Sequence, residues 1–237
     1  MIFATALYWG GRRLKFQEGK NDMDIKTVVF DMDGVLFDTE RLCMDCWVRV
    51  AEEMDIHDME EVFPLCIGLN ANDTKALILN HYGQDFPYEE YKVKTSQWFW
   101  KEIKENGLPI KTGVKEILVF LKENDYKIGL ASSTKYEAVI KHLERAGIRD
   151  YFVEVITGDM VEHSKPQPDI YLLACEKLGV KPEEAYAIED SPNGIRSAYA
   201  AGMKPIMVPD MIAPDAEMEQ LSFAIYNDLL EVKRWLT

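Results

Sequence analysis

The sequence predicts an α/β fold: a parallel sheet with helices on both faces, and a helical block inserted near its start. Three observations support this. The apolar run 28–30 ends in two aspartates and a glycine, which is typical of a buried strand that leads into a site. Residues 39–107 have helical spacing and no strand-like run. From Gly113 onward, helices and strands alternate, as they do in parallel sheets.

The composition fits a globular protein with a large core, because 47% of its 237 residues are hydrophobic and 29% are charged. The net charge of −14 argues against a surface for nucleic acid or anionic membranes, since basic patches hold phosphate backbones. A small phosphorylated substrate is compatible with this charge, because a metal ion and one lysine can reverse the field locally.

Residues 1–22 precede the first predicted strand. The segment Met1 to Trp9 is mildly apolar, but it lacks the order of a secretory signal and is too short to span a bilayer. Met23 directly precedes the strand and could be a natural start. We therefore expect an extension at 1–22 that need not be native, and a cytoplasmic protein.

The helical block starts after Glu40, where apolar residues recur at helical spacing: Leu42, Cys46, Trp47, Val50 and Met54. Phe63-Pro64 breaks the run, Asn72 or Asp73 can cap another helix, and Pro87 precedes a further one. The segment 106–109, Asn-Gly-Leu-Pro, ends the block. A wholly helical block directly after a strand that ends in acids has the organisation of an inserted lid.

The four cysteines suggest no disulfide framework in a chain of this length. Cys43 and Cys46 form a Cys-x-x-Cys pair, and on a helix both would share a face with Trp47 and Val50. No second pair with zinc spacing follows, although Cys66 is nearby. We expect the pair to pack in a core and not to bind metal or act in redox chemistry.

The second part of the chain alternates regularly. The predicted elements are helix 114–121, strand 127–131, helix 135–146, strand 153–156, helix 168–178, strand 185–188, helix 193–200 and strand 205–208, the last strand of the sheet. Polar side chains follow three of the predicted strands, at Asp31, Ser132 and Glu189, and Lys165 lies in a loop between elements. Because ligands of parallel sheets bind at the carboxyl ends of strands, we expect these side chains to converge.

Each of these segments also has a structural explanation. The sequence Asp-x-Asp-Gly can mark a calcium loop, but residues 35–37 are apolar where such a loop would continue with acidic ligands. Ser132 could only cap the helix that follows, and Lys165 could be an exposed loop residue. Together, however, the segments lie at the same edge of one sheet and are chemically complementary, which favours a site.

That complementarity suits phosphoryl transfer. One carboxylate can attack phosphorus to form an aspartyl-phosphate, and a second can protonate the leaving oxygen and later activate water. Magnesium prefers one or two carboxylates together with water and phosphate oxygens. A serine at a helix N-terminus can bind a phosphate oxygen, and a lysine supplies a point charge.

Four segments together resemble the motifs of the haloacid-dehalogenase superfamily, especially its phosphatase and β-phosphoglucomutase branch. They are Asp31-Met32-Asp33-Gly34-Val35, Leu130-Ala131-Ser132-Ser133, Lys165-Pro166-Gln167-Pro168-Asp169 and Glu189-Asp190-Ser191-Pro192-Asn193-Gly194. The match runs from about Met23 to the end in the family's order. It implies a Rossmann-like three-layer core at 23–38 and 108–237, a helical cap at 39–107, magnesium dependence and an aspartyl-phosphate intermediate.

The resemblance also implies a role for each matching residue. Asp31 would be the nucleophile and Asp33 the general acid and base. Ser132, Ser133 and Lys165 would bind the phosphoryl group. The Mg²⁺ ligands would be Asp31, Asp33 through its backbone carbonyl, Glu189 and Asp190. The dehalogenase branch is disfavoured, because an aspartate stands at position 33, where those enzymes lack the second acid.

Within this branch the sequence favours a phosphatase over a mutase. The mutase pattern has a histidine in the first cap helix and a lysine before the glycine of the substrate loop. The matching positions here hold Cys43 and Ile67, and Glu40 resembles the sugar-phosphatase variant. We expect the cap residues that set specificity to be Glu40, Gly68, Leu69 and Asn70.

We therefore expect a magnesium-dependent phosphatase that acts on a small phosphorylated metabolite, first of all a sugar phosphate, without nucleic-acid or membrane partners. A monomer is compatible with this expectation. A β-phosphoglucomutase-like mutase is the first alternative. The second is a non-catalytic phosphate-binding regulator or a receiver domain, although receivers combine an acidic cluster, a hydroxyl and a lysine in one short domain without a long insertion.

Overall fold

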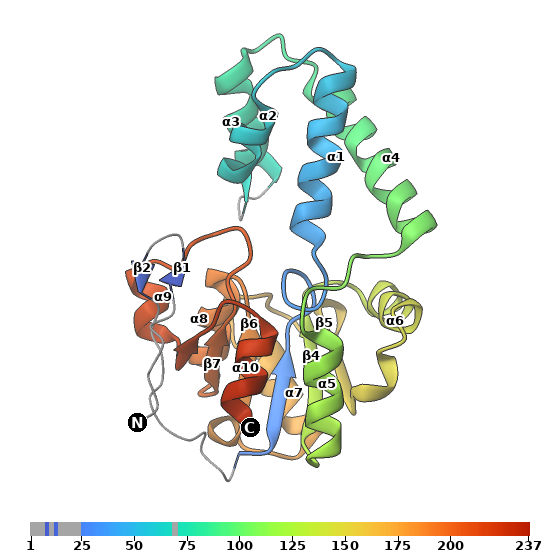
Figure 1. The fold of residues 1–237 in the computed structure, drawn as a ribbon. Coiled ribbons are helices and arrows are strands. Elements are labelled where there is room, and N and C mark those ends of the chain that lie inside the picture. The colour runs from blue at the N-terminus through green and yellow to red at the C-terminus, as the bar shows by residue number, and fades with distance from the viewer. Residues whose placement is uncertain (1–7, 10–11, 14–24, 68–70) are drawn as a thin grey trace. The chain divides into compact units, whose positions relative to one another are not determined.

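The computed structural model describes residues 8–9, 12–13, 25–67 and 71–237. The chain forms two compact units: a core unit, Met1–Phe37 with Ile110–Thr237, and a cap unit, Asp38–Pro109 (Figure 1). The two chain connections between the units lie side by side. Phe37 and Ile110 form an antiparallel bridge, and the N–H of Asp38 donates to the carbonyl of Pro109 at 2.9 Å.

The core unit is built on a six-stranded parallel sheet with the order β5-β4-β3-β6-β7-β8. The strands are β3 (Thr27–Phe30), β4 (Lys127–Ser132), β5 (Glu154–Thr157), β6 (Tyr186–Glu189), β7 (Lys204–Met207) and β8 (Ala224–Ile225). In the register of the sheet, Phe30 lies opposite both Leu130 and Ile188. The carboxyl ends of β3, β4 and β6 are therefore neighbours, which is where an open parallel sheet binds its ligands.

Helices cover both faces of this sheet. They are α5 (Val114–Glu123), α6 (Tyr136–Arg145), α7 (Asp169–Leu178), α8 (Pro192–Ala200), α9 (Ala216–Leu221) and α10 (Leu229–Leu236), with single turns η2 (Arg149–Tyr151), η3 (Gly158–Met160) and η4 (Pro182–Glu184). Helix α5 contacts β4 and α10, whereas α7 contacts β4, β5 and α8. Figure 1 shows α5 and α10 together in front of the sheet. The predicted three-layer α/β core with an inserted helical unit is confirmed.

The strand 205–208 was predicted to be the last of the sheet, and this is wrong. The structure adds β8 beyond it, where Tyr226 N–H also donates to the carbonyl of Met207. A strand of two residues is too short to produce a periodic pattern in the sequence. Within the segment expected as an extension, β1 (Tyr8–Trp9) pairs antiparallel with β2 (Arg12–Arg13), and the rest of 1–22 lies outside the described residues.

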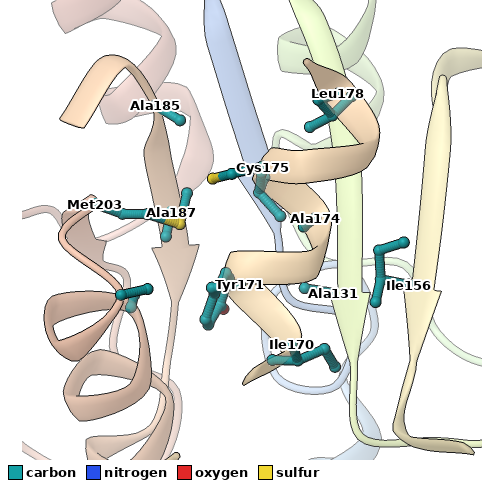
Figure 2. Packing of buried hydrophobic residues seen from close by; sticks show 13 residues of the cluster. Ala131, Ile156, Ile170, Tyr171, Ala174, Cys175, Leu178, Ala185, Ala187 and Met203 are labelled. Atoms are coloured by element: carbon teal, nitrogen blue, oxygen red, sulfur yellow. The ribbon is translucent and has the colours of Figure 1, made fainter. Parts of the chain in front are cut away.

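Helix α7 packs closely on the middle of the sheet (Figure 2). Its buried side chains, Ile170, Tyr171, Ala174, Cys175 and Leu178, form one cluster with small strand residues such as Ala131 and Ala187. At Gly129 a Cβ atom would lie 2.9 Å from Leu178 Cδ1, so a glycine is needed there for the close approach. Because Leu178 packs at Gly129, toward the start of β4, the loop before α7 reaches the carboxyl edge of the sheet.

The cap unit contains α1 (Thr39–Glu53), α2 (Met59–Val62), η1 (Phe63–Cys66), α3 (Ala71–Tyr82) and α4 (Tyr88–Asn106). Its described residues contain no strand, as expected. The buried core of the unit includes Val50, Ile78 and Tyr91, and the phenol of Tyr91 donates to the carbonyl of Trp47 at 2.5 Å. Asn72 lies in the first turn of α3, because the helix starts earlier than the cap position predicted for it.

The Cys43/Cys46 pair lies on α1, and all four cysteines are free thiols. Burial raises the pKa of Cys46 to about 11 and that of Cys43 to about 12. Since the thiolate is the reactive and metal-binding form, these two side chains behave as small apolar groups of the cap. Among the helices that the structure describes, none has the length and hydropathy to cross a membrane.

Candidate active site

The site is organised around Lys165, whose ammonium group joins the ends of three strands. Its Nζ donates to Asp31 Oδ1 at 2.5 Å, to Glu189 Oε1 at 2.6 Å and to the carbonyl of Ala131 at 3.0 Å. Asp31 directly follows β3, and its N–H donates to the carbonyl of Ile188 at 2.9 Å. The structure therefore brings together three segments that are far apart in the sequence.

Local contacts fix the loop that carries Lys165. Gln167 N–H donates to the carbonyl of Ser164 at 3.0 Å, and Ser197 Oγ on α8 donates to the carbonyl of Gln167 at 2.6 Å. Burial alone lowers the pKa of Lys165, but Asp31 and Glu189 outweigh it, so the net shift is upward. Lys165 therefore remains an ammonium ion, although its side chain is only 9% exposed.

Glu189 ends β6 and is completely buried. Its Oε1 also accepts the phenol O–H of Tyr171 at 2.7 Å, and its Oε2 accepts Ser191 Oγ–H at 3.3 Å. A Cβ at Gly194 would lie 1.9 Å from Glu189 Cδ, so the glycine of the fourth motif makes room for this carboxylate. Tyr171 belongs to the apolar cluster in Figure 2, while its hydroxyl reaches the polar site.

Asp31, Glu189 and Asp190 form an acidic cluster whose ligand atoms lie within 4.8 Å of one another. Burial, together with Glu189 and Asp33 and against the effect of Lys165, raises the pKa of Asp31 to about 8. Burial and then Glu189 and Asp31 raise the pKa of Asp190 well above its usual value. Neighbouring carboxylates that resist ionisation in this way need a cation to be ionised together.

The donor set of this cluster fits a hard divalent cation. Carboxylate oxygens are the ligands that Mg²⁺ prefers, whereas softer metals favour sulfur or imidazole. At Gly34, where φ is +81°, a Cβ would lie 2.1 Å from Asp190 Oδ2. The turn after β3 therefore needs glycine both for its backbone conformation and for the space that Asp190 occupies.

Asp33 lies in that turn and not in the acidic cluster. The turn is closed by Gly34 N–H, which donates to the carbonyl of Phe37 at 2.9 Å, and Asp33 also pairs with Phe37 in an isolated bridge. Asp33 Oδ2 accepts the hydroxyl of Thr134 at 3.0 Å. The carboxyl groups of Asp31 and Asp33 thus accept hydrogen bonds from different side chains.

Ser132 and Ser133 follow at the end of β4. Ser132 is fully buried, and its Oγ accepts Thr134 N–H at 3.1 Å. It therefore closes a turn and does not cap α6, which starts after Lys135 without a side-chain cap. Ser133 is exposed. Ser132 can still donate its own hydroxyl proton to a phosphate oxygen.

Of the predicted cap residues, Glu40 lies in the first turn of α1 and is partly buried. Gly68, Leu69 and Asn70 lie outside the described residues. Sequence reasoning missed two side chains that touch the site, Thr134 and Tyr171. Thr134 is two residues beyond Ser132, so its place in the polar segment after the strand could have identified it as a site residue. Tyr171 lies at a position with the periodicity of a core residue, and nothing in the sequence indicates that its hydroxyl contacts Glu189.

Comparisons with known proteins agree with this geometry. The sequence model of the haloacid dehalogenase-like hydrolases matches residues 28–208. A phosphorylated carbohydrates phosphatase of Thermotoga maritima is 33% identical over 77% of this chain and 84% of its own length. A β-phosphoglucomutase of Bacillus subtilis is 31% identical over 84% of this chain and 91% of its own.

Among solved structures, CbbY of Rhodobacter sphaeroides in complex with xylulose-1,5-bisphosphate has a TM-score of 0.64 and 26% identity. The similarity covers 87% of this chain and 96% of that one. The fold and the site define a hydrolase with a Rossmann-like core. The chain belongs to the haloacid dehalogenase-like hydrolase family, which confirms the resemblance found in the sequence.

Proposed function

We propose that this protein is a magnesium-dependent phosphatase that hydrolyses a sugar phosphate or a similar small phosphorylated metabolite through an aspartyl-phosphate on Asp31. One observation carries the proposal above the others. Lys165 holds Asp31 and Glu189 at the ends of adjacent strands, and both acids belong to a three-carboxylate cluster. Nucleophile, charge neutralisation and a metal-binding set are thereby combined at one sheet edge.

Asp31 is the proposed nucleophile, and its contacts with Lys165 and with the carbonyl of Ile188 support this role by fixing its position. Ser132, Ser133 and Lys165 would bind the oxygens of the phosphoryl group. Asp31, Glu189 and Asp190, with the backbone carbonyl of Asp33, would hold Mg²⁺. When bound, the ion would neutralise charge on the carboxylates and on the phosphoryl oxygens.

Asp33 is the proposed general acid and base. Its side chain stands apart from the acidic cluster, so it can exchange a proton while the cluster carries a cation. In the first half-reaction it would protonate the leaving oxygen, and in the second it would take a proton from the attacking water. General acid–base catalysis of this kind typically contributes about 10²–10⁴-fold to the rate.

Two comparisons support a sugar phosphate as the substrate. The Thermotoga maritima relative is named for phosphorylated carbohydrates, and the CbbY structure contains a sugar bisphosphate. We propose that four cap residues determine the specificity for such substrates: Glu40, Gly68, Leu69 and Asn70. This part of the proposal rests on the resemblance to the family, since three of these residues lie outside the described structure.

A mutase is the second candidate, because a β-phosphoglucomutase is among the relatives. The positions that carry the mutase's cap histidine and lysine hold Cys43 on α1 and Ile67 after η1. Neither side chain can bind a second phosphate through a positive charge, so we favour hydrolysis. Conversion of β-glucose 1-phosphate to glucose 6-phosphate faster than phosphate release would reverse this preference.

The test is phosphate release by the purified full chain from a panel of sugar phosphates and from p-nitrophenyl phosphate, with Mg²⁺ and with EDTA. We expect hydrolysis that EDTA abolishes and Mg²⁺ restores. Asp31→Asn should lower kcat by at least about 10³-fold, as loss of a nucleophile does. The matched control is Asp150→Asn, which changes an exposed acid of η2. Near-wild-type turnover by Asp31→Asn would refute the proposed nucleophile.

A further inference from the structure

A hydrogen bond joins Thr134 to Asp33, the proposed general acid and base. The Thr134 hydroxyl donates to Asp33 Oδ2 at 3.0 Å, across a separation of 101 residues. Thr134 belongs to the turn after β4, and Asp33 belongs to the turn after β3. The contact therefore joins the turns that follow two neighbouring strands.

The backbone of Thr134 is held on both sides. Its N–H donates to Ser132 Oγ at 3.1 Å, and its carbonyl accepts Gly158 N–H at 3.3 Å. Gly158 follows β5, and a Cβ there would lie 2.3 Å from the carbonyl oxygen of Ser133. The turns after β4 and β5 are thus packed backbone to backbone, and this packing fixes the Cα of Thr134.

Asp33 lies in a turn that is shaped by the hydrogen bond from Gly34 N–H to the carbonyl of Phe37, and its side chain is partly buried. A partly exposed carboxylate can adopt several χ1 and χ2 values unless a neighbour selects one. A proton donor is efficient only when it is in hydrogen-bonding reach of the atom that it serves, so this selection matters for the reaction.

We propose that Thr134 is a positioning residue that orients the carboxyl group of Asp33 for proton transfer, an inference that rests on the phosphatase function proposed above. The hydrogen bond to Oδ2 ties the carboxyl group of Asp33 to the turn after β4. Thr134 itself exchanges no proton with the substrate. It acts as the third group that orients an acid or base in a catalytic pair.

The proton balance of the reaction assigns Asp33 two steps. As Asp31 forms its bond to phosphorus, the ester P–O bond breaks, and Asp33 gives its proton to the leaving oxygen. Asp33 then takes one proton from the water that attacks the phosphorylated Asp31. Asp31 returns to a carboxylate, inorganic phosphate is released, and Asp33 is protonated again. Both steps need the same oxygen of Asp33 to face the reacting group.

The test compares Thr134→Val, which keeps the shape but removes the hydroxyl, with Thr134→Ser, which keeps the hydroxyl. The probes are phenyl phosphate and p-nitrophenyl phosphate, because phenol is the more basic leaving group and needs the proton more. Thr134→Val should lower kcat about tenfold for phenyl phosphate and no more than about twofold for p-nitrophenyl phosphate, a small part of a full general-acid effect. Thr134→Ser should restore most of the loss.

A double mutant locates the effect in Asp33. In Asp33→Asn the side chain transfers no proton, so adding Thr134→Val should change kcat for phenyl phosphate by less than about twofold. Equal losses on both substrates, failure of serine to rescue, or fully additive losses in the double mutant would each overturn the role of Thr134. A wild-type protein without Mg²⁺-dependent hydrolysis of either ester would overturn the phosphatase function together with this inference.

Discussion

The core unit and the cap unit bury their polar groups in different ways. In the core unit, buried charges contact one another across the sheet edge, as Lys165 does with Asp31 and Glu189. In the cap unit, the buried cluster is apolar, with aliphatic residues such as Val50 and Ile78. Trp47 packs edge-on against Phe63 and Tyr91. The ion pairs of the cap unit, such as Lys75 with Glu89 at 2.7 Å, are on the surface.

This difference indicates that the buried groups of the core unit serve the reaction, whereas those of the cap unit serve its stability. Burying several charges is expensive and is tolerated where they are paired or serve a reaction. A close-packed apolar interior, with the phenol of Tyr91 bonded to a backbone carbonyl, provides a rigid support. The interior of the cap unit therefore has the features of a scaffold, and substitutions of the same chemical kind should have unequal effects in the two units.

The largest contrast should come from the two lysines. Lys165→Met would leave two buried carboxylates without their cation, and breaking a buried ion pair in this way costs about 3–5 kcal/mol. We expect a lower melting temperature and a loss of turnover of p-nitrophenyl phosphate by about 10³-fold, similar to the loss of other site residues. Thermal unfolding and steady-state kinetics measure both.

Lys75→Met is the matched control in the cap unit. Its partner Glu89 is largely exposed, and solvent-exposed pairs contribute little to stability. The melting temperature and the turnover of p-nitrophenyl phosphate should be nearly unchanged. If Lys165→Met behaved as mildly as Lys75→Met, the separation between the two units would be refuted.

Two buried tyrosines give a second contrast of intermediate size. Tyr171 donates to Glu189 and Tyr91 donates to the carbonyl of Trp47, so each phenylalanine variant loses one hydrogen bond. Each should lose about 1 kcal/mol of stability. Only Tyr171→Phe should also lower kcat, by about tenfold, because a catalytic group that is slightly misplaced reacts more slowly. An equal loss of kcat in Tyr91→Phe would contradict this contrast.

The last contrast concerns pH and the protein without metal. The pKa of Asp31 is raised to about 8, so between its unfolded value near 3.8 and pH 8 the folded state binds more protons. Stability should therefore fall as the pH rises, by at most about 1.4 kcal/mol per pH unit for this group. Asp190 has the same sign, since its pKa is also raised.

The pH range from 7 to 8 is best for measuring this effect. The pKa of His142 is lowered by burial, so its contribution has the opposite sign and fades as the pH rises above its ordinary value of 6.5. Unfolding in EDTA should show a smaller slope for Asp31→Asn than for the wild type, and saturating Mg²⁺ should also reduce the slope. Parallel slopes for the two proteins in EDTA would contradict the raised pKa of Asp31.

Much of the core could be predicted because its signals are local. Runs such as Val28 to Phe30 and Leu130 to Ala131 mark buried strands, and parallel strands bring their carboxyl ends to one edge. Lys165 could be placed near Asp31 because its loop was expected at the same edge of the sheet. The structure brings these residues together because β3 lies between β4 and β6, so the carboxyl ends of the three parallel strands are neighbours.

Other features depend on tertiary contacts and have no local signal. Strand β8 exists because Ala224 and Ile225 pair with β7, although the segment has only two residues. The phenol of Tyr171 meets Glu189 because of the packing of α7, which its periodicity does not specify. Thr134 follows a polar strand end that the sequence does show, but its contact with Asp33 depends on the pairing of β3 with β4.

The most direct test of the central claim is chemical trapping of phosphorylated Asp31. The wild-type protein would be mixed with Mg²⁺ and a substrate found in the phosphate-release assay, then quenched with borohydride, which reduces an acyl phosphate to an alcohol. Tryptic peptide 27–41 contains Asp31, Asp33 and Asp38, so fragmentation must locate the change. We predict homoserine at position 31 alone, dependent on substrate and Mg²⁺. Steady release of phosphate with position 31 unmodified at every quench time would contradict the account.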